Sequence, residues 1–426
     1  MDKNLVALTP PMGWNSWDCY GASVTEAILL ENAQYMADNL KDFGWQYVVC
    51  DIQWSEPTAK SCDYNAFADL CMDEYSRLIP ATNRFPSSSD GQGFAPIAKK
   101  VHDMGLLFGI HIMRGIPRQA VHRNTAILGT NVRARDIAHP WSLCAWNSDM
   151  YGINPDAPGA QQYYDSLFEL YADWGVDYIK VDDICNTGRA HSDPYFGARE
   201  IEIIHKSIKR CKRPMVLSLS PGPAVVEHAS HLSKYANMWR ITDDLWDQWH
   251  LVKAMFERCD VWQTHVRPGC WPDCDMLPLG VLCCFRNGGE PCRLTKDEQR
   301  TLMTLWCIFR SPLMMGGDMR RMDEWTLSLL TNRELLHLTN HSEGAYQITR
   351  NDNEAIWATR DTKGAAYVAL FNLSDEERNV EASLKDLGFD SEVSLYDLWL
   401  HEESGYAKNI LGTKLNPHAS IIYKIG

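Results

Sequence analysis

The stretch Asp173-Trp-Gly-Val-Asp-Tyr-Ile-Lys-Val-Asp-Asp183 holds a helix end, an apolar strand and two adjacent carboxylates. Asp-x-Gly is typical of a helix C-terminus, because glycine readily adopts the left-handed conformation that follows the last turn. The same order recurs at Asp42-Phe-Gly44 before the strand Tyr47–Asp51, and at Asp103-Met-Gly105 before Leu106–His111. Three helix ends that each lead into an apolar strand predict a parallel α/β protein.

Further apolar segments extend this pattern on both sides. With the three strands above, the candidates make eight: Met12–Trp17, Met215–Ser220, Met238–Thr242, Val261–Val266 and Ser311–Met315. Eight βα units over about 340 residues predict a (β/α)8 TIM barrel with enlarged loops. A doubly wound open sheet is the competing fold, but no Gly-x-Gly-x-x-Gly follows a strand to support a dinucleotide site.

The pattern changes near Ser342, after which short strands and turns replace helical periodicity. Four segments read as strands: Glu354–Arg360, Ala365–Asn372, Val393–Trp399 and Ser420–Lys424. We therefore predict a (β/α)8 barrel of residues 1–343, followed by a small antiparallel C-terminal β-domain of residues 344–426.

Composition excludes several classes of protein. A net charge of −14 over 426 residues argues against nucleic acid or an anionic membrane as a partner. No apolar stretch is long enough for a signal peptide or a membrane span, so we expect a cytoplasmic location for the chain as given. The fourteen cysteines follow neither a disulfide-scaffold nor a zinc pattern. We expect no metal and no cofactor, and the sequence leaves open whether the chain forms a homo-oligomer.

Polar and aromatic residues gather where the predicted strands end, which is where barrel enzymes carry their chemistry. Adjacent acids at Asp182-Asp183 and Asp243-Asp244 could cap the helices that follow. The nearby cations Lys180 and Arg240 favour a polar site instead, since caps need no cation. Carboxylates, cations and an indole suit a sugar. The strand-end residues are Trp17, Asp51, His111, Lys180, Asp182, Ser220, Arg240, Asp244 and Asp275.

Five short motifs give the chain a specific resemblance. They are Thr9-Pro-Pro-Met-Gly-Trp-Asn-Ser-Trp17, Arg84-Phe-Pro86, Lys180-Val-Asp182, Arg240-Ile-Thr-Asp-Asp244 and Trp271-Pro-Asp-Cys-Asp-Met276. In this order they resemble the α-galactosidase / α-N-acetylgalactosaminidase family, glycoside hydrolase family twenty-seven (melibiase-like). The resemblance covers nearly the whole chain, including the family's C-terminal β-domain.

The resemblance implies a retaining exo-glycosidase with two catalytic carboxylates. Asp182 matches the nucleophile, and Asp244 matches the acid/base in preference to Asp243. The other matching positions are substrate-binding: Trp17, Asp51, Lys180, Arg240, Asp275 and Met276.

Departures from the family pattern bear on which sugar is bound. Ile52 stands where the family usually has a second acid, which favours a β-L-arabinopyranoside, a sugar without a hydroxymethyl group. Ser220 and Ala224 are the small residues of the N-acetylgalactosaminidase pattern and favour a 2-acetamido group. His111 replaces a family tyrosine and either donates to the sugar or is an ordinary satisfied histidine. We expect a terminal α-galactoside or α-N-acetylgalactosaminide as substrate, with β-L-arabinopyranoside as the alternative.

The sequence leaves open two other functions and one disulfide bond. Lys180 could form a Schiff base in an aldolase, although neighbouring carboxylates would keep its amine protonated. A sugar-binding protein without catalysis is the second, disfavoured because both catalytic acids are present. The family has a disulfide beside the nucleophile, and Cys144 and Cys185 lie near the matching positions, with Cys185 offset by one.

Overall fold

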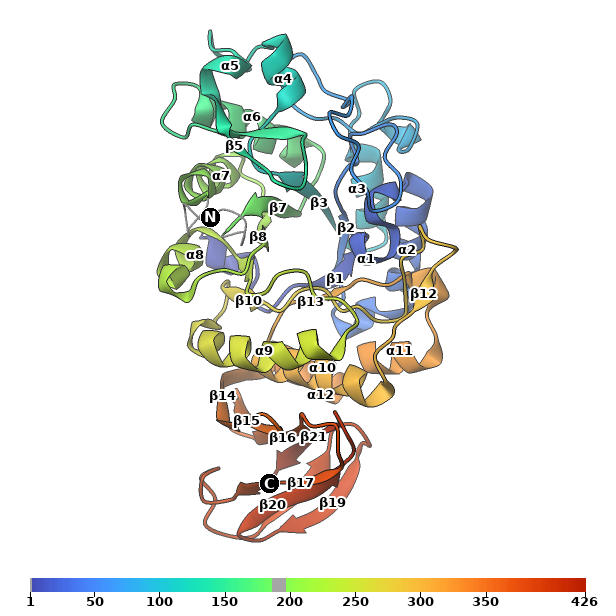
Figure 1. The fold of residues 1–426 in the computed structure, drawn as a ribbon, viewed down its shortest axis with the longest axis vertical. Coiled ribbons are helices and arrows are strands. Elements are labelled where there is room, and N and C mark those ends of the chain that lie inside the picture. The colour runs from blue at the N-terminus through green and yellow to red at the C-terminus, as the bar shows by residue number, and fades with distance from the viewer. Residues whose placement is uncertain (1, 186–196) are drawn as a thin grey trace.

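A computed structural model describes residues 2–185 and 197–426 of the chain. The larger part is a ring of parallel strands surrounded by helices, and the smaller part is a β-domain packed against helices α9, α10 and α12 (Figure 1). Aromatic contacts join the two parts. The ring of Phe256 on α9 lies 4.8 Å from that of Phe371, and Phe309 on α10 lies 6.2 Å from Trp357.

The central sheet contains eight strands in the described part of the chain, and every pairing is parallel. A parallel bridge between Leu277, which follows β10, and Met315 on β13 joins the two edges of the sheet. The ring is therefore closed, and the predicted (β/α)8 barrel is confirmed. The strand order is β10 (Trp271–Asp273), β9 (Met238–Arg240), β8 (Val216–Pro221), β7 (Tyr178–Ile184), β3 (Leu107–Met113), β2 (Tyr47–Cys50), β1 (Met12–Asn15) and β13 (Leu313–Met315).

Helices follow the strands around the outside of the barrel. The three expected helix ends are present, since Gly44, Gly105 and Gly175 have φ values of 97°, 79° and 82°. None of the helices in residues 2–185 and 197–426 is both long and apolar enough to cross a membrane. The outer helices are α2 (Glu26–Asn39), α3 (Ala95–Asp103), α6 (Ala160–Asp173), α7 (Ala198–Arg210), α8 (Ala229–Tyr235), α9 (Trp249–Trp262), α10 (Lys296–Phe309), α11 (Glu324–Leu330) and α12 (Arg333–His341).

One predicted strand is wrong. Val261–Val266 forms the end of α9 and the 3-10 turn Gln263–His265, and the seventh barrel strand is β10. The segment begins and ends in valine, a residue that favours strands, but Trp262 completes the buried face of the helix and packs on Trp239, with ring centroids 5.9 Å apart. β10 is only three residues long and includes a proline, so it has little sequence signal.

Two long insertions, here called excursions, follow barrel strands at their carboxyl ends. One runs from β2 to α3 and has little regular structure. The other runs from β3 to α6 and contains a three-stranded sheet in the order β4-β6-β5. Its elements are β4 (Ile116–Pro117), α4 (Arg118–Arg123), α5 (Ala134–Ile137), β5 (Ala138–Leu143) and β6 (Met150–Ile153), and a short helix α1 (Trp17–Tyr20) follows β1.

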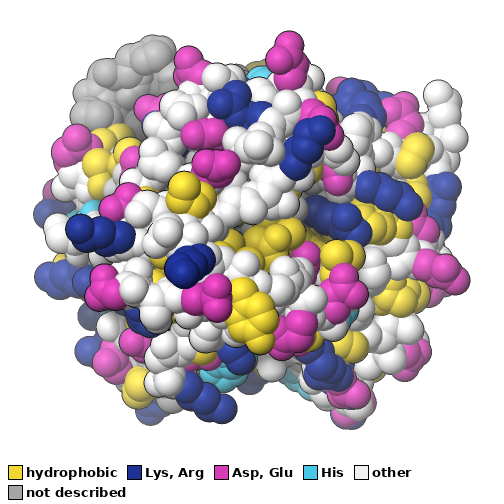
Figure 2. All heavy atoms as spheres, turned by 90° about the horizontal axis from the view of Figure 1, so that it is seen from below, with side chains coloured by type: hydrophobic (Ala, Val, Ile, Leu, Met, Phe, Trp, Pro, Cys, Tyr) yellow, Lys and Arg dark blue, Asp and Glu magenta, His cyan; other side chains and the backbone are white. Residues whose placement is uncertain are grey.

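The C-terminal part is an antiparallel six-stranded sheet with a two-stranded sheet packed on it. Acidic and basic side chains are interspersed over its outer face (Figure 2). The first strand begins at Ser342, although the division of the chain at residues 343 and 344 stays a prediction. The strands are β14 (Ser342–Arg350), β15 (Glu354–Asp361), β16 (Ala366–Asn372), β17 (Arg378–Ser383), β18 (Val393–Asp397), β19 (Glu402–Ala407), β20 (Ile410–Leu415) and β21 (Ser420–Ile425).

Candidate active site

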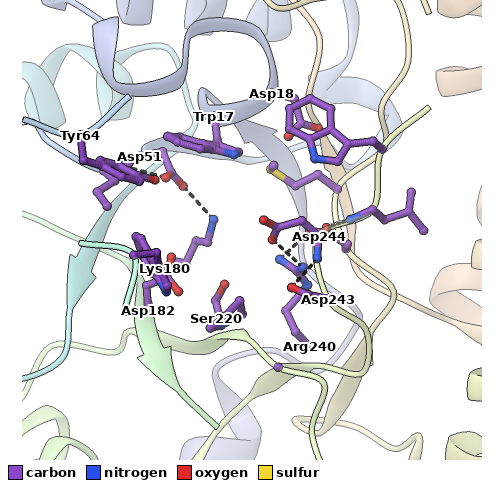
Figure 3. A pocket seen from close by; sticks show the side chains of 18 residues that line it. Trp17, Asp18, Asp51, Tyr64, Lys180, Asp182, Ser220, Arg240, Asp243 and Asp244 are labelled. Atoms are coloured by element: carbon purple, nitrogen blue, oxygen red, sulfur yellow. Dashed lines mark hydrogen bonds and ion pairs between the residues drawn. The ribbon is translucent and has the colours of Figure 1, made fainter. Parts of the chain in front are cut away.

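A cavity of about 350 Å³ opens at the carboxyl ends of the barrel strands (Figure 3). Most of the residues predicted from strand ends line it, although they come from six different strands or strand-following loops. Because a parallel barrel directs all its strand ends to one rim, residues far apart in sequence meet there. The predicted residues in its lining are Trp17, Asp51, Ile52, Lys180, Asp182, Ser220, Arg240, Asp244, Asp275 and Met276.

Asp51 and Lys180 form a buried ion pair at one side of the cavity. Lys180 Nζ lies 3.0 Å from Asp51 Oδ2, and Asn15 Nδ2 donates to the same oxygen at 2.8 Å. Burial raises the pKa of Asp51, but the charges of Lys180 and His111 outweigh this and hold the pKa well below its usual range. Burial lowers the pKa of Lys180, but the negative charges of Asp51 and Asp182 outweigh burial and raise this pKa above its usual value. The amine therefore stays protonated, which argues against a Schiff-base nucleophile.

Asp182, at the end of β7, has both carboxylate oxygens held. The backbone N–H of Asp183 donates to Oδ1 at 2.8 Å, and His111 Nε2 lies 2.9 Å from Oδ2. An ionised carboxylate can only accept, so Nε2 carries the proton of this bond. Burial raises the pKa of Asp182, but the His111 hydrogen bond and the charges of His111 and Lys180 bring it below its usual value.

Arg240 organises the opposite side. Its guanidinium reaches Asp275 Oδ1 at 2.9 Å and Asp244 Oδ1 at 3.0 Å. The Asp275 side chain is 5% exposed and that of Asp244 is 58% exposed. Asp275 is thus a buried partner of the arginine, and Asp244 is the carboxylate that solvent and a ligand can reach. Figure 3 shows Asp182 and Asp244 on opposite sides of the cavity.

An apolar wall completes the cavity above Asp51. Ile52, only 4% exposed, forms a cluster with Met113 and Met150, and the aromatic rings of Trp17, Tyr64 and Trp146 pack against this cluster. Trp17 and Tyr64 are stacked with ring centroids 5.9 Å apart and planes 9° apart. Ile52 therefore contributes no polar group to this wall of the cavity.

Two predicted residues do not line the cavity. His111 is 1% exposed and touches Asp182 instead. Ala224 lies outside, against α9, in a separate surface depression. The chain turns away at Gly222, whose φ is +75° and where a Cβ would lie 2.5 Å from the carbonyl oxygen of Arg240. Of the proposed pair of small residues, only Ser220 therefore faces the site.

Sequence reasoning missed several residues that line the cavity. Tyr64 and Trp146 come from the two long excursions, where nothing in the local sequence indicates that the chain folds back over the barrel. Asp18 follows the recognised Trp17, is 2% exposed and has one carboxylate oxygen with no hydrogen-bond partner. Burial, followed by the charge of Asp275, raises its pKa well above the usual range. The other missed lining residues are Pro221, Gly222, Leu245 and Trp246. Asp243, the alternative to Asp244 as acid/base, lines the cavity as well.

The residues behind Asp182 form a buried network. Arg114, with a side chain 1% exposed, lies 2.9 Å from Asp183 Oδ2 and 3.2 Å from Glu200 Oε2. All fourteen cysteines lie in the described residues and are free thiols, so Cys144 and Cys185 are not linked. Burial raises the pKa of Asp183 to about 6 against the opposing charge of Arg114.

Comparisons with known proteins identify the family. The model of the α-galactosidase A family matches residues 146–341, and that of the α-galactosidase C-terminal β-sandwich domain matches residues 351–425. The crystal structure of a family 27 β-L-arabinopyranosidase from Geobacillus stearothermophilus is 56% identical, with a TM-score of 0.97 over 100% of this chain and 98% of that one. The chain belongs to glycoside hydrolase family 27.

Other members of family 27 are similar over almost the whole length. A Bacillus halodurans C-125 structure, provisionally named an α-N-acetylgalactosaminidase, is 50% identical, with a TM-score of 0.88 over 98% of this chain and 97% of that one. Alpha-galactosidase 2 of Arabidopsis thaliana is 26% identical over 99% of this chain and 91% of its own length. The protein is therefore a glycoside hydrolase that acts on carbohydrate.

Proposed function

We propose that this protein is a retaining β-L-arabinopyranosidase. The observation that carries this proposal is the apolar wall of Ile52, Trp17 and Tyr64 in the cavity. A hydroxymethyl group on the sugar would face Ile52 without the hydrogen bond that a carboxylate offers. A sugar with only hydrogens at that carbon loses nothing there, and a site that leaves a polar group unpaired discriminates strongly. The 56% identity to an enzyme named for this activity supports the proposal.

The proposed mechanism uses Asp182 and Asp244 in two displacements. Asp182 attacks the anomeric carbon while protonated Asp244 gives its proton to the leaving oxygen, and a covalent glycosyl-enzyme forms. Asp244, now a carboxylate, then takes a proton from water, which attacks the anomeric carbon and releases Asp182. We expect the two carboxyl groups to be about 5–5.5 Å apart, as retaining enzymes require.

The neighbouring charges suit these two roles. Lys180 stays protonated beside Asp51 and Asp182, which favours the ionised form that a nucleophile needs. Arg240 contacts one oxygen of Asp244 and is itself neutralised by Asp275. The second oxygen of the exposed Asp244 is left to reach the glycosidic oxygen. We propose that Lys180, Arg240, Asp51 and Ser220 contact the hydroxyl groups of the sugar.

Hydrolysis of an α-galactoside or an α-N-acetylgalactosaminide is the second candidate. Ser220 in the lining leaves room beside the sugar, as the N-acetylgalactosaminidase pattern requires. Ala224, the other half of that pattern, faces away from the cavity. The structure therefore favours the pentopyranoside over the acetamido sugar.

A panel of nitrophenyl glycosides tests the proposal. We expect kcat/KM to be highest for the β-L-arabinopyranoside, ahead of the α-galactoside and the α-N-acetylgalactosaminide. In Ile52→Asp, the ratio of α-galactoside to β-L-arabinopyranoside kcat/KM is expected to rise by about tenfold or more, as for a hydrogen bond to a charged group. A wild-type preference for either of the other sugars would refute the proposed substrate. Proton NMR should show that the first-formed sugar keeps the configuration of the substrate.

A further inference from the structure

Tyr64 reaches the cavity from the long segment between β2 and α3, outside the barrel strands. Its ring contacts two indoles that come from different parts of the chain. Trp17, on α1, stacks on it at 5.9 Å, and Trp146, between β5 and β6, lies at 5.4 Å with planes 46° apart. An aromatic ring that packs on two others has little freedom to swing away when a ligand enters.

The phenol also lies close to the reacting groups. Figure 3 shows Tyr64 at the edge of the cavity next to Trp17 and Asp51. Burial is the main cause that raises its pKa above the usual range, and the nearby charges of Asp182, Asp51 and Asp244 raise it further. Tyr64 thus lines the same cavity as Asp51 and Asp182, and its hydroxyl group stays neutral.

Tyr64 and Ile52 belong to one apolar surface. Tyr64 packs on the cluster of Ile52, Met113 and Met150, so the two side chains share a wall of the cavity. If the isoleucine at position 52 were the only difference, a hydroxymethyl group would still fit in the cavity but would have no hydrogen-bond partner there. A bulky ring that packs on the same cluster as Ile52 also takes up room in that part of the cavity.

We propose that Tyr64 is a specificity-determining residue, whose ring closes the cavity over Ile52 against sugars that carry a hydroxymethyl group. This inference rests on the proposed function, because it takes the sugar to lie with that carbon toward Ile52. It assigns the discrimination to two residues with different effects. Ile52 withholds a hydrogen bond, and Tyr64 occupies volume.

The test separates the contribution of the Tyr64 ring to substrate preference from that of its hydroxyl group. Tyr64→Phe keeps the volume, and its ratio of β-L-arabinopyranoside to α-galactoside kcat/KM should stay within about twofold of the wild type. Tyr64→Ala removes the ring, and the same ratio should fall about tenfold or more, the scale on which an apolar pocket discriminates one carbon group. Tyr64→Leu keeps an apolar side chain of intermediate size and should give an intermediate ratio.

Phe67→Ala is the matched control. Phe67 lies in the same segment, is 76% exposed and lines a different depression with Arg118. Its substitution should leave the ratio unchanged. Circular dichroism and the thermal midpoint establish that each variant is folded. If Tyr64→Ala does not fold, Tyr64→Leu provides the test of the ring.

Three results would overturn the inference. An unchanged ratio in both Tyr64→Ala and Tyr64→Leu would mean that the ring excludes nothing. An equal change in Tyr64→Phe and Tyr64→Ala would assign the effect to the hydroxyl group. A wild-type preference for the α-galactoside would refute the proposed function together with this inference, whereas the first two results leave the proposed function standing.

Discussion

The hydrogen bond between His111 and Asp182 predicts a change in the acid side of the pH profile. His111→Phe keeps a planar ring of similar size and removes the Nε2–H donor to Asp182 Oδ2, now at 2.9 Å. The pKa of Asp182 is below its usual value because the His111 hydrogen bond and the charges of His111 and Lys180 outweigh the effect of burial. Without His111 that pKa rises, so ionised Asp182 is lost at a higher pH than in the wild type.

The magnitude follows from the strength and the burial of the bond. The two side chains are 2% and 12% exposed, so water cannot replace the donor or screen the pair effectively. A hydrogen bond to a charged group contributes about 1.5–3 kcal/mol. On the acid limb, where the ionised fraction limits the rate, kcat/KM should fall by about ten- to a hundredfold. At the plateau Asp182 is ionised in both proteins, and the loss should be much smaller.

The assay is the pH profile of kcat/KM on the preferred nitrophenyl glycoside. His111→Gln can still donate a hydrogen bond from its amide and should recover part of the wild-type acid limb. His102→Phe is the control, because His102 makes the same kind of bond to Asp177, at 2.7 Å, outside the cavity. An acid limb of His111→Phe that coincides with that of the wild type would refute the argument that His111 tunes the nucleophile.

The remaining predictions concern the catalytic acids and a buried cation. Asp182→Asn should abolish turnover of every glycoside, measured by product release, since no nucleophile remains. Asp244→Asn should spare substrates with good leaving groups in the first step, and added azide should then give a glycosyl azide; the same behaviour in Asp243→Asn alone would reassign the acid/base. Arg114→Met should lower the free energy of unfolding by about 3–5 kcal/mol in urea titrations, because it leaves two buried carboxylates without their cation. Arg199→Met breaks an exposed ion pair and should cost less than about 1 kcal/mol; equal losses in the two variants would contradict this reasoning.

Local sequence determined the barrel and the chemistry of its rim. Each Asp-x-Gly helix end needs only a glycine in the left-handed conformation, and Gly44, Gly105 and Gly175 adopt it. Apolar runs such as Tyr47–Cys50 are buried on both faces of a parallel sheet, so their composition alone indicates their place. An acid at the end of such a run reaches the rim whatever the rest of the chain does.

Local sequence failed where neighbours outside the segment decide the outcome. Val261–Val266 begins and ends in valine, a residue that favours strands, yet Trp262 is buried by packing on Trp239 and completes a helix. β10, with its internal proline, becomes a strand because β9 offers it a parallel edge. Such pairing depends on residues distant in sequence, which periodicity within one segment cannot report.

The sequence alone thus determined which residue types stand at the strand ends, because strand and helix signals are local. Only the tertiary structure decided what those residues touch. It turned Ala224 away from the cavity, set His111 against Asp182 and brought Tyr64 from a distant loop onto Trp17. These contacts depend on how loops fold back over the barrel, and the free energy that fixes a loop comes from the packing of side chains far apart along the chain.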